Sequence, residues 1–459
     1  MTEQVVGLSA ASRRFPAIGW LLLSVAAMHG LMLVYDYLHP SVFFNADRAL
    51  ARWETIQGLY KAWDVGQFAS YLGGHGIPGD YLFQGVLLAL VGIYGLILAQ
   101  VSLALFAGYC VYRMGRLLGM ASGWATLASG VYLLLPHTLI FPHQLASEAL
   151  YSPLLTISLW LTLASTAGKD PRALWLGAGL AGIATLIRPV TLLWPLLPIV
   201  VLLSLKRYRS AGGYAVAAYV LIVLWMAFMA GQTGSFGLGE SDHDMAHNLY
   251  QRTARVVETL PPAEQADAKT QYLTSGAQGT LAVGEFLHFG LRYPVPFLLH
   301  SVRDSVIFFV KSGFERIPID YLLFNEEARA SLQDSDSGWR KRLEKEGIGA
   351  ALGYLWHTQG MVLVVSLVGS VFMLVLMALA IIGGWDLLRA REAKTRRLTA
   401  VLLVALPVYI FLFSQLVDAM QSRHRAPAEA GIVLLAVWGG MRLARRFSSD
   451  DVTYEREMR

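Results

Sequence analysis

The chain has 459 residues, of which 55% are hydrophobic and only 15% are charged, with a formal net charge of +5. A soluble domain carries about 25% charged residues, so the composition excludes an ordinary soluble protein and indicates an integral membrane protein. Continuous apolar runs of about 20 residues recur along the chain, which predicts membrane-spanning helices and not the alternating pattern of a β-barrel. The single cysteine, Cys110, excludes an intramolecular disulfide.

These runs predict ten spans in one all-α transmembrane domain over residues 1–445, followed by a cytoplasmic tail over residues 446–459. The predicted spans cover residues 15–36, 94–112, 120–141, 146–167, 173–188, 190–205, 211–231, 360–384, 398–418 and 427–441. In this alternating scheme the short connections rich in Lys and Arg fall on one side, which the positive-inside tendency makes cytoplasmic. We expect a multi-pass protein of the bacterial inner membrane with both termini in the cytoplasm. The basic flanks explain the net charge through topology and attraction to anionic lipids, without a nucleic-acid partner.

The first apolar run follows Arg13 and Arg14 and has some features of a signal peptide. Its length and the lack of a clear small-x-small cleavage site favour a retained helix.

Two longer regions, residues 37–93 and 232–359, remain on the outer face. In the first, apolar side chains at helical spacing predict an amphipathic helix at the membrane surface; they are Leu50, Trp53, Ile56, Tyr60 and Trp63. The second is too long to be a simple connector. Within it, residues 296–310 are shorter than a span and contain charged residues, so we expect a re-entrant or surface helix there.

The motifs found are weak one by one but occur in an informative order. No Walker, GxGxxG, HExxH or CxxC pattern is present. An aspartate follows the first span, "SEALYSPLL" opens a later helix, "GLAGIATLIRP" closes another and "SRHRAPAEAGIVLL" enters the last. In this order they resemble the GT-C superfamily of polytopic glycosyltransferases, which includes the protein O-mannosyltransferases and the bacterial transferases of aminoarabinose and galacturonic acid to lipid A. The resemblance covers the layout of residues 15–445.

The resemblance implies an inverting glycosyltransferase with a GT-C-like fold. It implies a polyprenyl-phosphate sugar as donor, an active site on the periplasmic or outer face, and an acidic residue of the first outer loop as the base. The other expected partners are membrane lipids and an acceptor that is a lipid, a glycan or a protein. No cofactor is certain, although a divalent metal ion is compatible with the pattern.

Asp47, in "SVFFNADRALARW", is the first candidate for the base. Transfer to a hydroxyl needs one carboxylate to take the acceptor proton while the phosphate leaves, and partial desolvation at the mouth of the first helix raises its basicity. The alternative interpretation is that Asp47 caps the helix that begins at Arg48. Asp36 and Asp64 are alternates for the base.

A leaving phosphate needs cations where its charge develops. Arg423, His424 and Arg425 lie before the last span on the outer face, against the positive-inside tendency, so an anionic ligand is expected there. The alternative is contact with any anionic lipid headgroup. Arg188 and Arg48 are further candidates for the donor phosphate, although Arg188 also fits an arginine that snorkels to the interface.

The stretch "FPHQLASEALY" contains His143, Gln144 and Glu148 near the outer end of a helix. An ionisable residue inside the bilayer is expensive and usually functional. Glu148 is predicted to bind substrate hydroxyls, join a metal site or pair with the outer arginines, and a purely stabilising ion pair remains the alternative.

The second outer region adds weaker candidates in "ESDHDMAHNLYQR". His243 and His247 have a metal-ligand spacing on a helix, while the glycines before them suggest a lid that carries His243 and Asn248; a hydrated loop is the simpler alternative. Lys311, Arg303 and Arg316 are candidates to reach the phosphate or an acidic acceptor.

Two other functions stay open. A transporter or lipid flippase would suit ten helices, but its polar residues should lie at mid-membrane and not at one face. An O-antigen ligase or polymerase would use a diphosphate-linked donor. The sequence does not determine the sugar, the acceptor, metal dependence or the oligomeric state.

Overall fold

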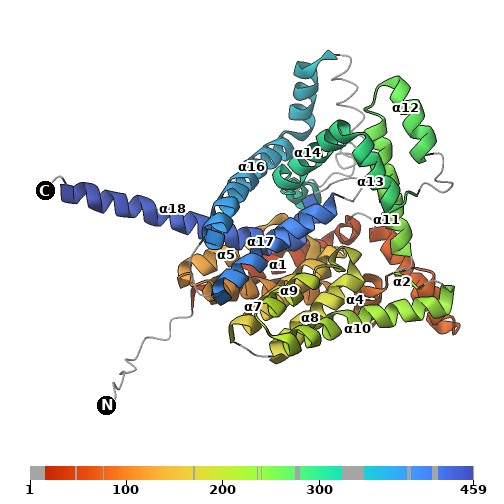
Figure 1. The fold of residues 1–459 in the computed structure, drawn as a ribbon, viewed down its shortest axis with the longest axis horizontal. Coiled ribbons are helices and arrows are strands. Elements are labelled where there is room, and N and C mark those ends of the chain that lie inside the picture. The colour runs from red at the N-terminus through yellow and green to blue at the C-terminus, as the bar shows by residue number, and fades with distance from the viewer. Residues whose placement is uncertain are drawn as a thin grey trace.

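In a computed structural model, the chain is described over residues 16–46, 49–75, 77–168, 171–234, 236–238, 240–273, 280–322, 346–389, 394–415 and 422–457. Every regular element in these ranges is helical, which confirms the predicted all-α class. Figure 1 shows a bundle of crossing helices, with α11 to α14 forming an arm at one end and α18 projecting from the other.

The N-terminal part contains two candidate spans, α1 and α4, and three shorter helices between them. Its elements are α1 (Ala17–Leu38), η1 (Pro40–Phe44), α2 (Ala49–Asp64), α3 (Phe68–Gly73) and α4 (Gly79–Leu117). The helix predicted in the first outer region is α2, which buries Ile56 fully and leaves Trp63 at its end exposed. The helix α4 begins well before the predicted span and is broken at Gly92, whose φ of 70° and ψ of −176° are open to glycine at little cost.

The middle of the chain supplies much of the bundle. Its elements are α5 (Ser122–Leu134), α6 (Pro136–Ile140), η2 (Phe141–His143), α7 (Glu148–Gly168), α8 (Pro171–Ile187), η3 (Pro189–Thr191), α9 (Leu196–Ser204) and α10 (Tyr208–Thr233). The predicted span 120–141 is bent by 66° between residues 122–134 and 136–143. The bend coincides with Pro136, which cannot donate a backbone hydrogen bond to continue the preceding helix.

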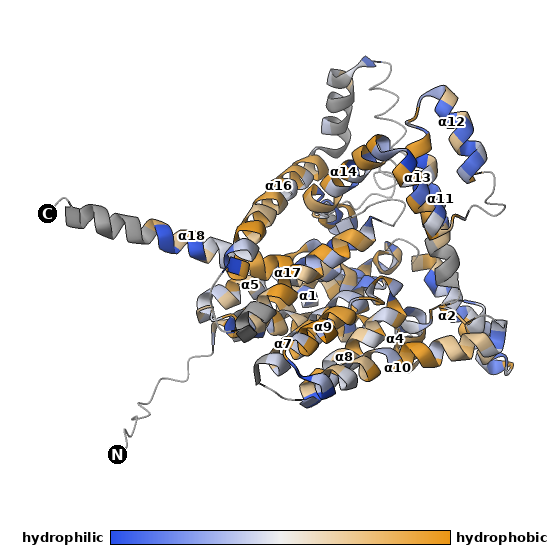
Figure 2. Cartoon of the chain, in the orientation of Figure 1, coloured by the Kyte–Doolittle hydropathy of each residue, from blue (hydrophilic) through white to orange (hydrophobic). Residues whose placement is uncertain are grey.

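The last part contains the arm and three further apolar helices. Its elements are α11 (Glu240–Val257), α12 (Pro262–Ala268), η4 (Lys269–Leu273), α13 (Val283–Arg292), α14 (Pro294–Val310), η5 (Pro318–Leu322), α16 (Ile348–Arg389), α17 (Lys394–Ser414), η6 (Ser422–Ala428) and α18 (Glu429–Glu457). The helix predicted over residues 296–310 is therefore α14. Figure 2 shows that α16 and α17 are mainly apolar and that α12 is hydrophilic.

Six helical segments in the described part of the chain are long and apolar enough to cross a membrane, or seven if the bent pair is one span. This makes the chain a multi-pass membrane protein. The other three predicted spans coincide with shorter apolar helical segments, over residues 171–187, 189–204 and 399–414. Helix length and composition therefore support six or seven spans in the described residues, and the prediction of ten full spans goes further than that.

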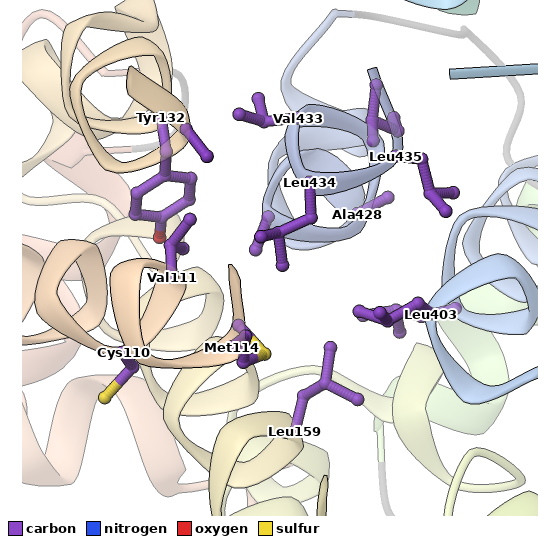
Figure 3. Close-up of a cluster of buried hydrophobic side chains, with 14 of the residues drawn as sticks. Cys110, Val111, Met114, Tyr132, Leu159, Leu403, Ala428, Val433, Leu434 and Leu435 are labelled. Atoms are coloured by element: carbon purple, nitrogen blue, oxygen red, sulfur yellow. The ribbon is translucent and has the colours of Figure 1, made fainter. Parts of the chain in front are cut away.

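The main core joins helices that are far apart in the sequence. Figure 3 shows Met114 of α4, Tyr132 of α5, Leu159 of α7, Leu403 of α17 and Leu434 of α18 around one apolar interior. A second apolar cluster packs α2, α3 and α10 against the first half of α4. The C-terminal ends of α1 and α8 lie near the N-terminal end of α7, where His143 contacts Asp36 and Glu148 contacts Arg188.

The tightest helix crossing is between α16 and α18. A Cβ atom built on Gly383 would lie 1.9 Å from the Leu435 carbonyl oxygen, and one on Gly439 would lie 2.2 Å from that of Leu379. Only glycine permits this backbone approach, a common feature of helix packing within membranes.

Candidate functional site

The candidate site is organised around residues 143–148, "HQLASE", which we call the hub segment. It connects η2 to α7, and each of its six residues is buried. Its backbone is held from two sides: the Leu145 N–H donates to the Phe43 carbonyl over 2.9 Å, and the Gln84 side chain donates to the Ala146 carbonyl over 3.0 Å. Its four polar side chains must find partners inside the protein, because burial without hydrogen bonds is costly.

Three arginines from distant parts of the chain lie around Glu148 and its neighbour Ser147. The Arg188 guanidinium donates to the Glu148 carboxylate over 2.5 Å and to the Ser147 hydroxyl over 3.0 Å. Arg423 of η6 lies 3.8 Å from the same carboxylate oxygen. Arg52 of α2 donates to Ser147 over 3.3 Å. We call Arg52, Arg188 and Arg423 the arginine cluster.

The arginine cluster is more accessible than the carboxylate that it surrounds. The side chains of Arg52, Arg188 and Arg423 are 15%, 21% and 17% exposed, whereas that of Glu148 is 2% exposed. Arg52 also pairs with Asp80 of α4 over 2.8 Å. Three partly exposed guanidinium groups that lie together are suited to bind an anionic group.

Gln144 joins the hub segment to the second outer region. It donates to the Asp320 carboxylate over 3.0 Å, and Asn45 donates to the other oxygen of Asp320 over 3.2 Å. Arg316 lies 3.4 Å from Asp320 and donates to the Asn45 carbonyl over 2.9 Å. Arg316, which we predicted to reach a phosphate, is thus engaged in holding η5 against the residues that follow η1.

His143 joins the hub segment to α1. Its Nδ1 lies 2.5 Å from a carboxylate oxygen of Asp36, and its Nε2 lies 2.8 Å from Nδ1 of His29. All three side chains are buried. Tyr321 packs its ring edge-on against His143, and burial raises the pKa of the Tyr321 phenol above its ordinary value. Asp36, an alternate base in the sequence, has an internal partner here.

Arg425 has a different environment from Arg423. Its side chain is fully buried and donates to the carbonyls of Phe308, Lys311 and Ser312 and to Glu429. Glu429 also bonds to His137 over 2.7 Å. These contacts tie η6 to the end of α14 and occupy the guanidinium internally. The geometry therefore favours a structural role for Arg425. Of the two arginines in "SRHRAP", only Arg423 belongs to the arginine cluster.

The space beside Glu148 is a small cavity with a partly polar wall. Its lining includes Glu148 and Ser152 of α7, His137 of α6, and Tyr132 of α5. The cavity thus lies between the arginine cluster and the internal network of His137, Glu429 and Arg425. His424 is half-buried, with Arg188, Arg423 and Glu148 as charged neighbours.

Several predicted residues are not brought into this group. Asp47 and Arg48 lie outside the described residues, as does the side chain of His243. Asp64 is exposed at the end of α2, and Asn248 is half-buried on α11. Lys311 is 54% exposed and lies 4.0 Å from Glu315. Among the side chains that the structure describes, no group of three or more His, Cys, Asp or Glu residues is arranged to hold a metal ion.

Sequence reasoning missed Arg52, Asp80, Ser147 and Asp320. Arg52 had a usable signal, because it is a basic residue on the predicted outer face, against the same tendency that drew attention to Arg423. Asp320 had no such signal, since only folding brings it to Gln144.

No family model, no curated protein and no solved structure matches the chain. The function is therefore argued from the site and from the order of the sequence motifs.

Proposed function

We propose that this protein is a membrane glycosyltransferase that moves a sugar from a polyprenyl-phosphate donor to an acceptor on the outer face of the membrane. The observation that carries the proposal is the convergence of Arg52, Arg188 and Arg423 on the neighbouring residues Ser147 and Glu148. A partly exposed group of arginines beside apolar helices matches a ligand with a phosphate head and a hydrocarbon tail.

The arginine cluster supports a donor with an anionic head such as a phosphodiester, because guanidinium groups donate hydrogen bonds to phosphate oxygens. During transfer the bond between the sugar and the phosphate oxygen breaks, and the leaving polyprenyl phosphate gains negative charge. Arginines already in place stabilise that charge without reorganising. Glu148 would then act as the buried counter-ion that keeps the arginines together in the absence of donor.

The acceptor hydroxyl forms the new bond to the sugar and gives up its proton to a carboxylate. We assign this base role to Asp47 on the sequence argument alone. Its described neighbour Asn45 is held by Asp320 and Arg316, so the chain just before Asp47 is anchored to the hub segment. Arg188 and Arg423 would hold the phosphate with Arg52, and His424 would lie at its edge.

The test is glycosyl transfer in proteoliposomes with a panel of radiolabelled polyprenyl-phosphate sugars. The variants are Asp47→Asn and Arg423→Gln, and the control is Arg255→Gln, an exposed arginine of α11 outside the cluster. We expect the wild-type protein to consume one donor of the panel. Asp47→Asn should lose most of the turnover and Arg423→Gln should use the donor less well, whereas Arg255→Gln should behave as the wild type.

The same vesicles separate the alternatives. If an unmodified lipid or solute crosses the bilayer and no sugar is transferred, the protein is a transporter or flippase and not a glycosyltransferase. If only diphosphate-linked donors are consumed, the protein is an enzyme of the O-antigen ligase or polymerase type and does not use a monophosphate donor. Full activity of Asp47→Asn would move the base to another carboxylate.

A further inference from the structure

The helices α13 and α14 each carry a row of exposed apolar side chains, and we call the two rows together the ridge. Along α13 they recur every fourth residue, and along α14 at intervals of three and four, so each set lies on one helix face. The exposed fractions are 46% for Val283, 59% for Leu287, 82% for Leu291, 65% for Val295, 62% for Leu298, 65% for Leu299, 51% for Val302 and 53% for Val306. A patch of this extent marks an interaction surface.

The opposite face of the same two helices is fixed to the protein. Phe286 and Phe289 of α13 are buried in an apolar cluster with α11 and η4. On α14, Asp304 pairs with the buried Arg252 of α11 over 3.2 Å, and Ser301 accepts from Arg252 over 2.9 Å. The ridge therefore cannot turn inward without breaking this packing.

The far end of the ridge leads into the membrane-spanning bundle. Phe309 of α14 packs against Phe411 of the apolar helix α17, with ring centroids 4.9 Å apart, and Arg425 of η6 binds the Phe308 carbonyl. Val408 and Leu412 of α17 are themselves 50% and 57% exposed, as expected of lipid-facing positions. The end of α14 thus packs against an apolar helix of the bundle that also exposes apolar side chains.

We propose that α13 and α14, the second half of the arm, lie in the membrane interface, with this ridge in the acyl region of the leaflet next to the arginine cluster. The occupant of the ridge is lipid. Arg303 is exposed on α14, and a basic residue on the polar side is a feature of interfacial helices that meet anionic headgroups. The proposal does not depend on the proposed enzymatic activity.

Site-directed spin labelling of the full chain tests the arm. The lone and buried Cys110 is replaced by Ala, and single cysteines are placed at Leu287, Leu291, Leu299 or Val302. The control label replaces Ala266, an exposed residue of the hydrophilic helix α12. Each labelled protein is checked for monodispersity and reconstituted in phosphatidylethanolamine and phosphatidylglycerol vesicles.

The arm is supported if ridge labels collide several-fold more with oxygen than with a water-soluble nickel chelate, while the Ala266 label shows the reverse. In addition, Leu291→Glu should make the Val302 label more accessible to the chelate. Ridge labels that collide mainly with the chelate would overturn the proposal. So would labels shielded from both reagents, and dipolar broadening between them would then show that a second copy covers the ridge.

Discussion

The Arg188 guanidinium and the Glu148 carboxylate are 2.5 Å apart, although 40 positions separate them in the chain. Arg188 follows α8 and Glu148 opens α7, so the contact joins the C-terminal end of one helix to the N-terminal end of the other. Arg188 keeps 21% of its side chain exposed, whereas Glu148 keeps 2%. The pair therefore has an open cationic side and a buried anionic side.

Replacing Glu148 by Gln should destabilise the fold by about 1–3 kcal/mol, because the clustered arginines lose a buried counter-charge. Thermal unfolding in detergent measures the loss. The double variant Glu148→Gln with Arg188→Gln should recover part of it, since neither charge then lacks its partner. Additive losses in the double variant would show that the pair does not couple.

Replacing Arg423 by Gln should raise the KM for the lipid donor about 10-fold to 100-fold, since a hydrogen bond to a charged group contributes about 1.5–3 kcal/mol. The unfolding temperature should change less than in a variant of the fully buried Arg425, because the Arg423 side chain is 17% exposed. Donor titration in proteoliposomes, with Arg255→Gln as control, measures the effect. An unchanged KM would remove Arg423 from the donor site.

Replacing Arg425 by Lys should lower the unfolding temperature, in contrast to the same change at Arg423. Lys cannot reproduce the planar set of donors with which Arg425 reaches three carbonyls and Glu429, so buried acceptors lose partners at a cost of about 1–3 kcal/mol. Parallel melting curves of the two Lys variants make the comparison. Equal stability of both variants would contradict the structural role.

Replacing Gly439 by Ala should disrupt the crossing of α16 and α18, whereas Gly440→Ala should not. The added methyl at Gly439 would lie 2.2 Å from the Leu379 carbonyl oxygen, but at Gly440 the nearest contact is a flexible Leu379 side chain at 4.0 Å. The expected loss at Gly439 is about 1–3 kcal/mol, as for overpacking in a core. Unfolding of both variants in one detergent provides the measurement, and equal stability would count against so close a crossing of the two helices.

Replacing Asp36 by Ala should loosen α1 from the hub segment, because the buried His143 Nδ1 would lose its acceptor. Asp36→Asn keeps an oxygen at that position and should cost less. Limited proteolysis between α1 and α2, followed together with thermal unfolding, reports both effects. A greater loss with Asn than with Ala would indicate that the contact is not an ordinary hydrogen bond.

The membrane class and the helical segments followed from the sequence, because long apolar runs leave the backbone no other way to satisfy its hydrogen bonds in lipid. Helix lengths were less predictable: Gly92 and Pro136 break helices locally, and α4 extends well ahead of its predicted span. Arginines on the predicted outer face run against the positive-inside tendency, so charge and hydropathy were enough to single out "SRHRAP" and "LIRP".

The sequence alone therefore determined that this is a membrane protein, and it singled out candidate residues at the predicted outer ends of the helices, since hydropathy and charge are local properties. The tertiary structure decided which candidates meet. It separated Arg423, which faces Glu148, from Arg425, which is enclosed two positions away, and it added Arg52, Ser147 and Asp320. Such choices depend on contacts between residues tens to hundreds of positions apart, which no local pattern encodes.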